Sequence, residues 1–272
     1  MSRKKRTIGL CIWLGMALVF LAGGLLAGGP AEKHGSIKAV MRDAVLHEDH
    51  RISFLGLKEV NPAVVSAFVV TAIVLLAAFC IRVFVIPKFR YVPGKFQLLL
   101  EQLVGFFDGL AKSNSPHRNG FLGAYVFAAG VYIFIGTLFE LFGLQGMTTE
   151  GLSITLPAPL SDINAAISLG CLSYGVILSG GIAGNGLKGV GSTLKDFSLP
   201  ISMSFRLFGA LLSGLLVTEL VYYYISLSFV LPVVVGVMFT LLHALIQTYV
   251  LTMLTALFYG EVSERHKKHE KK

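Results

Sequence analysis

An arginine inside an apolar segment is the residue of this sequence best suited to act on ions. Arg206 lies in PISMSFRLFGALLSGLLVTEL, with apolar neighbours on both sides. A charged side chain at the centre of a bilayer costs roughly 2.5–3.5 kcal/mol on insertion scales, so such residues are rare and mostly functional. Two structural explanations remain open. Arg206 could extend to the near membrane surface, or it could pair with an acid of a neighbouring helix for packing alone.

Other polar residues lie in or at the ends of apolar segments. Taken singly, each is more typical of a hydrogen bond between helices than of a channel. His243 and Gln247 are one turn apart on one helix face, and Glu219 lies about 20 Å beyond Arg206 along the helix axis. Together with an intramembrane arginine, these residues predict an ion path through protein. The remaining members of this set are Glu140, Asp162 and Asn164.

The segments that carry these residues are membrane spans by composition. Apolar residues make up 54% of the chain and charged residues only 14%, which is outside the usual range of soluble domains. Apolar runs of 18 or more residues predict transmembrane helices. The expected fold class is therefore an all-α polytopic membrane protein with five or six spans. The runs are 8–29, 63–86, 120–143, 163–184, 199–226 and 229–259.

The N-terminal run has two interpretations. Residues 8–29 follow a basic start and end in Ala-Gly-Gly, which fits a cleaved signal peptide. The run is also long enough to remain as a transmembrane helix, an interpretation that we favour slightly. Residues 30–62 would then form a polar external segment of mixed charge.

The last two apolar runs are longer than a perpendicular crossing needs. Thirty residues of helix reach about 45 Å, against about 30 Å of hydrocarbon. We expect tilt or kinks to absorb the difference, with kinks possible at four positions. These positions are Gly209, Gly214, Pro232 and Gly236.

A shorter amphipathic helix is expected over residues 96–112. Gln97, Glu101, Asp108 and Lys112 fall on one helix face, with apolar residues opposite. This pattern is typical of a helix at a membrane surface.

Several classes of site are not expected. The net charge of +8 is spread over loops and ends, as in membrane proteins, and predicts no nucleic-acid partner. Cys11, Cys80 and Cys171 are scattered within apolar runs, a spacing that suits neither a metal site nor a disulfide framework. No nucleotide-binding or catalytic motif is found, so we expect no cofactor and no chemistry by this chain alone.

Four segments of this sequence resemble subunit a of F-type ATP synthases, a membrane ion channel and stator. The most specific is SMSFRLFGALLSG, which resembles the S-x-S-x-R-L-F-G-N signature of that family. The resemblance covers about residues 60–262, in order. The other three segments are PGKFQLLLEQLVGFF, LSDINAAISL and HALIQTYVLTMLTALFYGE.

The resemblance implies a function and partners. Subunit a lies against a rotating ring of c subunits, each with a membrane carboxylate, and ions reach the ring through two half-channels. Arg206 matches the family's essential arginine, Gln247 matches its partner on the last helix, and Ser202 belongs to the same signature. The peripheral-stalk b subunits, the rest of the complex and the lipid membrane are the other implied partners. The implied ion is a proton, with Na⁺ left open.

This sequence departs from the family pattern at several positions. Ala210 replaces the usual Asn, and Leu215 stands where many members carry an acidic residue or His. Glu219, one turn further, is the candidate substitute for that residue. Glu140 occupies a position that is often Asn. We expect Glu219 and His243 to line the outer path, with Glu140, Asp162 and Asn164 near its mouth.

The expected organisation has three parts. Residues 1–62 are a signal or extra helix with an external segment, 63–262 the subunit a membrane domain, and 263–272 a basic cytoplasmic tail. A secondary ion-coupled transporter is the alternative, although no internal repeat is visible. A scaffold without transport would not need Arg206. The expected location is a bacterial plasma membrane.

Charge distribution yields a testable topology. Basic loops favour the cytoplasm, and residues 144–162 contain no Lys or Arg. Single cysteines introduced near positions 90, 190 and 268 should therefore react with an impermeant thiol reagent only from the cytoplasmic side. A cysteine near position 148 should react only from outside, and labelling of that position from the cytoplasm would reverse the topology.

Overall fold

The computed structural model describes residues 52–54, 57–147, 153–223 and 231–264, together with the single residues Gly15, Lys38 and Arg42. The expected span 8–29 and the tail 265–272 lie outside this range, apart from Gly15. Within the described residues, five helical segments are long and apolar enough to cross a membrane. The all-α polytopic fold is therefore confirmed. These segments are Pro62–Lys88, Gly120–Phe142, Ile163–Asn185, Ser198–Thr218 and Gly236–Ser263.

The five expected spans within the described residues match the observed helices to within a few residues. One antiparallel strand pair precedes α3, and a second pair and a short helix lie between the later long helices. In chain order the elements are β1 (Ile52–Phe54), β2 (Leu57–Val60), α3 (Pro62–Cys80), a π turn (Ile81–Val85), a 3₁₀ turn (Ile86–Lys88), α4 (Lys95–Asn114), α5 (Gly120–Phe139), a 3₁₀ turn (Glu140–Phe142), β3 (Gln145–Met147), β4 (Ser153–Thr155), a 3₁₀ turn (Pro159–Ser161), α6 (Ile163–Asn185), α7 (Leu187–Lys195), α8 (Ser198–Tyr223) and α9 (Leu231–Ser263).

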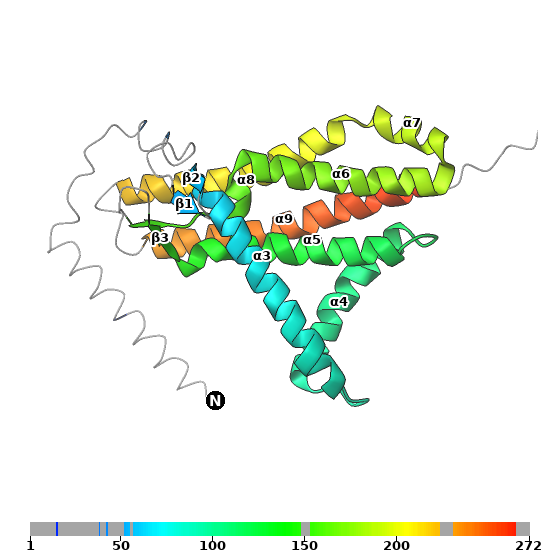
Figure 1. Cartoon of the computed structure of the whole chain (residues 1–272), viewed down its shortest axis with the longest axis horizontal. Helices are drawn as coiled ribbons and strands as arrows, with labels where there is room; N and C mark the ends of the chain where they lie inside the picture. Colours follow the sequence, from blue (N-terminus) through cyan, green and yellow to red (C-terminus); the bar gives the residue numbers. More distant parts are fainter. Residues whose placement is uncertain are drawn as a thin grey trace, which may run out of the picture.

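Four long helices form a bundle with α9 at its centre. Helix α9 contacts α5, α6 and α8, and α6 also packs along α8. Figure 1 shows these helices running nearly side by side along the long axis of the molecule. Their shared core buries Ile133 of α5, Ile177 of α6 and Leu207 of α8. Contact between α8 and α9 confirms that the last two helices pack together.

Helix α3 crosses this bundle at a steep angle and leaves it (Figure 1). Asn61 caps its start by accepting a hydrogen bond from the Ala63 amide at 2.9 Å, and Pro62 follows at the first helical position. These residues are typical of a helix start. The buried residues of α3 lie between Pro62 and Val70, and the later turns of the helix are mostly exposed within the described chain.

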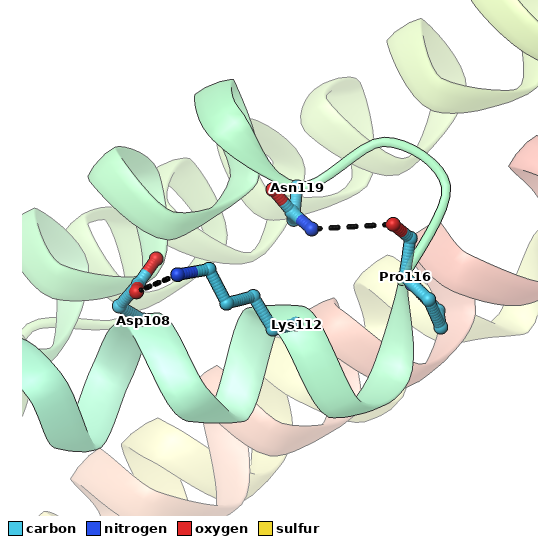
Figure 2. Close-up of polar contacts among 4 residues, drawn as sticks. All are labelled: Asp108, Lys112, Pro116 and Asn119. Carbon is cyan, nitrogen blue, oxygen red and sulfur yellow. Dashed lines mark hydrogen bonds and ion pairs between the residues drawn. The ribbon is translucent and has the colours of Figure 1, made fainter.

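Helix α4 returns from the far end of α3 to the bundle, and its polar face has the expected pairs. The Gln97 side chain donates to the Glu101 carboxylate at 2.8 Å. Figure 2 shows Lys112 paired with Asp108 one turn away. In the turn that leads to α5, the Asn119 amide donates to the Pro116 carbonyl at 3.4 Å (Figure 2).

Hydrogen bonds gather the helix ends into two groups. At one end, His117 contacts the Ser263 hydroxyl at 2.9 Å, and the Asn185 amide donates to the carbonyls of Val262 and Glu264. This end therefore holds the turn between α4 and α5, the end of α6 and the end of α9. The opposite end holds the starts of α3 and α6, where the Asn61 amide donates to the Asp162 carboxylate at 2.6 Å.

Glycine residues, which have no side chain, let the helices approach each other closely. A Cβ added to Gly180 of α6 would lie 2.7 Å from the ring of Tyr259 in α9. Tyr259 is only 3% exposed, so its ring has little room to move aside. Small residues at such positions are the usual means of packing helices in membranes. The contact between α6 and α9 therefore depends on Gly180.

The substitution Gly180→Ala should destabilise the fold. The added methyl group would force Tyr259 or a whole helix to shift, at a cost of about 1–3 kcal/mol. Gly175→Ala is the matched control, because Gly175 lies in the same helix with no atom within 4 Å of an added Cβ. The control should be neutral or more stable by up to about 1 kcal/mol. Unfolding midpoints of the detergent-solubilised chain test this, and equal midpoints for the two variants would contradict it.

Candidate functional site

Arg206 lies on the face of α8 that points away from the bundle. Met203, Leu207 and Leu211 occupy the opposite face and are buried in the core. Because these positions recur at helical spacing, they mark the face of α8 that packs on the bundle, and the exposed residues of the helix lie on its other faces. Arg206 has no acidic partner among the described residues. The outward positions are Ile201, Ser202, Phe205, Arg206, Gly209 and Ser213.

Small residues flank the arginine on this outward face. Ser202 and Gly209 lie about one turn before and after Arg206 on α8. With little side chain on either side, the backbone of another helix could come close to the guanidinium. Ser204, on the buried side, donates its hydroxyl to the Pro200 carbonyl at 2.6 Å and packs at Gly170 of α6. This contact fixes the rotation of α8 and hence the direction of Arg206.

His243 of α9 lies over Gly214 of α8. A Cβ added to Gly214 would be 3.3 Å from Nδ1 of His243, so the ring occupies the space that glycine leaves. Phe239, one turn earlier on α9, also packs near the imidazole, with ring centroids 5.9 Å apart. Gly214 is about 12 Å beyond Arg206 along the helix axis. The structure therefore brings His243 to α8 two turns away from the arginine.

Gln247 follows His243 by one turn and is buried. Only 5% of its surface is exposed, and its Oε1 atom has no hydrogen-bond partner among the described residues. An unpaired buried acceptor costs about 1–3 kcal/mol, so it marks a position where a donor is expected. Because α8 and α9 are antiparallel, Gln247 lies nearer to the level of Arg206 than His243 does. The two side chains form no hydrogen bond with each other in this structure.

The outer position Glu219 is only partly described. Its backbone belongs to α8, just over one turn beyond Gly214 and the imidazole of His243. Its side chain lies outside what the structure describes. Thr218 beside it donates its hydroxyl to the Gly214 carbonyl at 2.9 Å.

Asp162 caps helix α6 and joins it to α3. One carboxylate oxygen, Oδ1, accepts from the amides of Asn164 and Ala165 at 2.7 and 3.2 Å. The other, Oδ2, accepts from the side chain of Asn61. Both oxygens are therefore engaged in structural hydrogen bonds. Sequence reasoning missed Asn61, although an asparagine directly before a helix-starting proline is a capping signal.

The other two expected residues of this end lie on exposed or half-buried turns. The Asn164 side chain is exposed in the first turn of α6, and Glu140 is half-buried. Glu140 opens the 3₁₀ turn that follows α5, and this turn contacts α9. Neither lies in the row formed by Arg206, Gln247 and His243.

The described residues contain no group of three or more His, Cys, Asp or Glu side chains that could hold a metal ion. Cys80 is half-buried and Cys171 exposed, and both are free thiols. The arrangement can therefore offer a fixed positive charge, an imidazole and an amide along two adjacent helices. Such a row suits the passage or release of an ion.

Comparisons with known proteins agree with these features. The family model for the ATP synthase A chain matches residues 64–260. ATP synthase subunit a of Cereibacter sphaeroides is 27% identical over 208 residues, which cover 72% of this chain and 80% of that protein. ATP synthase subunit a of Histophilus somni is 27% identical over 199 residues, which cover 61% of this chain and 73% of that protein.

Proposed function

Because the chain belongs to the ATP synthase A chain family, subunit a of F-type ATP synthases, we propose that it carries ions between two half-channels and a rotating ring of c subunits. We propose a proton as the ion, since the proposed row contains an imidazole and a carboxyl group, two groups that bind and release protons. Ion flow through this path is coupled to synthesis or hydrolysis of ATP by other subunits.

The observation that carries the proposal is the outward direction of Arg206. A guanidinium stays charged at any working pH. On this helix it would face hydrocarbon unless another protein covers it, at a cost of roughly 2.5–3.5 kcal/mol. A ring helix with a membrane carboxylate provides both the cover and the opposite charge. The small residues Ser202 and Gly209 leave room for that helix to approach.

The fixed charge has two consequences for ion transfer. It attracts a deprotonated ring carboxylate, which favours loss of the proton from that carboxylate as it passes. It also repels cations, so an ion cannot move directly from one half-channel to the other along α8. Each ion must therefore travel on the ring. Ser202 lies on the side of Arg206 nearer the start of α8, where we place the inner half-channel.

The outer half-channel is proposed along the facing surfaces of α8 and α9. His243 lies over Gly214, and Glu219 follows on α8 about 20 Å from Arg206 along the axis. Gln247 continues this row toward the arginine, and its unpaired Oε1 can accept from the guanidinium or from a hydrated ion. We propose that Glu140, Asp162 and Asn164 lie near the mouth. There Asp162 acts chiefly as the anchor between α3 and α6, because its oxygens are already occupied.

The proposed orientation places the C-terminus in the cytoplasm of a bacterial cell, with the chain in the plasma membrane. Hydrogen bonds that join His117 and Asn185 to the end of α9 support a common side for these basic segments. Residues 144–162 contain no Lys or Arg, and Asp162 of this segment lies at the opposite end of the bundle, beside Asn61. We keep 63–262 as the membrane domain, with 1–62 and 263–272 as its extensions.

The later turns of α3 are mostly exposed. We propose that b subunits or lipid contact them.

Arg206 is the first test of the proposed function. Arg206→Ala should reduce ATP-driven proton pumping in vesicles to the passive leak, because the ring carboxylate loses its counter-charge. Arg206→Lys should also fail, since a compact ammonium does not replace the planar guanidinium. Arg118→Ala, in the turn before α5, is the matched control and should pump normally. Coupled pumping by the Arg206→Ala complex, with normal assembly, would refute the assignment.

The outer path is tested with Glu219→Gln and His243→Ala, singly and together. Each removes a titratable group from the row while leaving Arg206 in place, so passive proton flux should fall and its pH dependence should shift. Thr218→Val is the control on the same turn, because it removes a polar group that bonds only to its own helix. A double variant with the flux and pH profile of the unmodified complex would assign the path to other residues.

A further inference from the structure

The segment between α3 and α4 carries positive charge and exposed apolar side chains together. Lys88, Arg90 and Lys95 are exposed, and none has an acidic partner in the part of the chain that the structure describes. Between them, Tyr91 is fully exposed and Val92 nearly so. We call residues 88–95 the elbow. A cluster of cations around an exposed tyrosine is typical of contact with the headgroup region of a membrane.

The elbow is held in a defined shape by Gln97. Its side-chain oxygen accepts from the Arg90 amide at 3.0 Å, and its side-chain nitrogen donates to the Arg90 carbonyl at 2.9 Å. Gln97 also donates to Glu101, so the side chain that holds Arg90 is itself held by a residue of α4. The cations are therefore presented by a backbone fixed in place before any ligand binds, which lowers the entropic cost of binding.

An apolar stripe leads from the elbow along α4. Phe96, Leu99, Leu103 and Phe106 are all exposed and recur at intervals of three and four residues, so they share one helix face. From Phe96 to Phe106 the stripe is about 15 Å long. It begins next to Lys95 and is continuous, so a long apolar ligand could lie along it.

The stripe ends in an apolar cavity of about 520 Å³ between α4, α5 and α9. Leu103 and Phe106 line it from α4, Phe134 from α5, and Leu245 and Tyr249 from α9. A methylene group occupies about as much space as a water molecule, roughly 30 Å³, so the cavity holds about one alkyl chain.

We propose that the elbow and the cavity bind one anionic phospholipid of the bilayer. Its phosphate headgroup lies among Lys88, Arg90 and Lys95, with Tyr91 at the interface, and one acyl chain follows the α4 stripe into the cavity. Charge complementarity selects an anionic over a zwitterionic lipid. The chain fills the space that α4 leaves against the bundle, so the lipid fixes the position of α4. This site is independent of the ion path along α8 and α9.

The test uses the purified ATP synthase complex that contains this chain, reconstituted in phosphatidylcholine. The probes are phosphatidylglycerol and phosphatidylcholine with a spin label on one acyl chain, and the relative affinity is taken from the immobilised fraction. The unmodified complex should prefer phosphatidylglycerol. Arg90→Gln with Lys95→Gln should lower that preference by about 25-fold, since each cation near an anionic surface contributes roughly fivefold. Lys188→Gln with Lys195→Gln, both in α7, is the control of equal charge and should change little.

A second pair of variants tests the acyl-chain site. Leu103→Trp fills the cavity and should displace the immobilised chain, whereas Leu98→Trp, off the stripe on the same helix, should not. Equal immobilisation of the two lipids by the unmodified complex, or an equal effect of both charge variants, would overturn the headgroup site. Retained immobilisation in Leu103→Trp would overturn the acyl-chain site. No immobilised phosphatidylglycerol at all would mean that another subunit covers the surface, and would also overturn the proposal.

Discussion

A permanent charge that cannot face lipid constrains the whole arrangement of this chain. Arg206 is exposed on α8, and the proposed function requires that another protein cover this surface. The rest of the bundle holds that helix in one rotation. Met203 and Leu207 anchor the opposite face in the core, and Ser204 packs at Gly170 of the neighbouring helix. Rotating α8 by a third of a turn would bury the charge and expose the core, so the direction of the arginine is tied to the stability of the fold.

Hydrogen bonds hold the ends of the helices together, and close packing of side chains holds their middle turns together. Asn61 and Asp162 each cap their own helix and bond to each other, which joins α3 to α6 at one end. At the other end, the Asn185 side chain donates to the Val262 carbonyl in the last turn of α9. Between these ends, contacts such as that of Gly180 with Tyr259 carry the packing. This division is expected in lipid, where burial of apolar surface gives little force between helices.

The sequence predicts the spans well because hydrocarbon imposes a length and a composition. The run 163–184 became Ile163–Asn185, and the polar face of α4 was expected correctly. The direction in which each helix faces was harder to predict, because a side chain that faces lipid is as apolar as one that faces the core. A contact such as that of His243 with Gly214 could therefore be found only from the structure. The sequence did not predict the two strand pairs or helix α7. Each of these elements is short, and such segments carry too few residues for a periodic pattern to show.

The length of α9 also affects how the membrane voltage acts along it. The helix has 33 residues, and a helix of that length extends about 50 Å, so it would lie wholly within a hydrocarbon core of about 30 Å if it were strongly inclined. One turn, such as that from His243 to Gln247, then advances about 3 Å across the bilayer, or roughly a tenth of its thickness. The electrical work on a unit charge over that turn is about 0.2 kcal/mol per 100 mV. An ion moving along this helix would therefore travel mostly sideways in the field, through many small voltage drops.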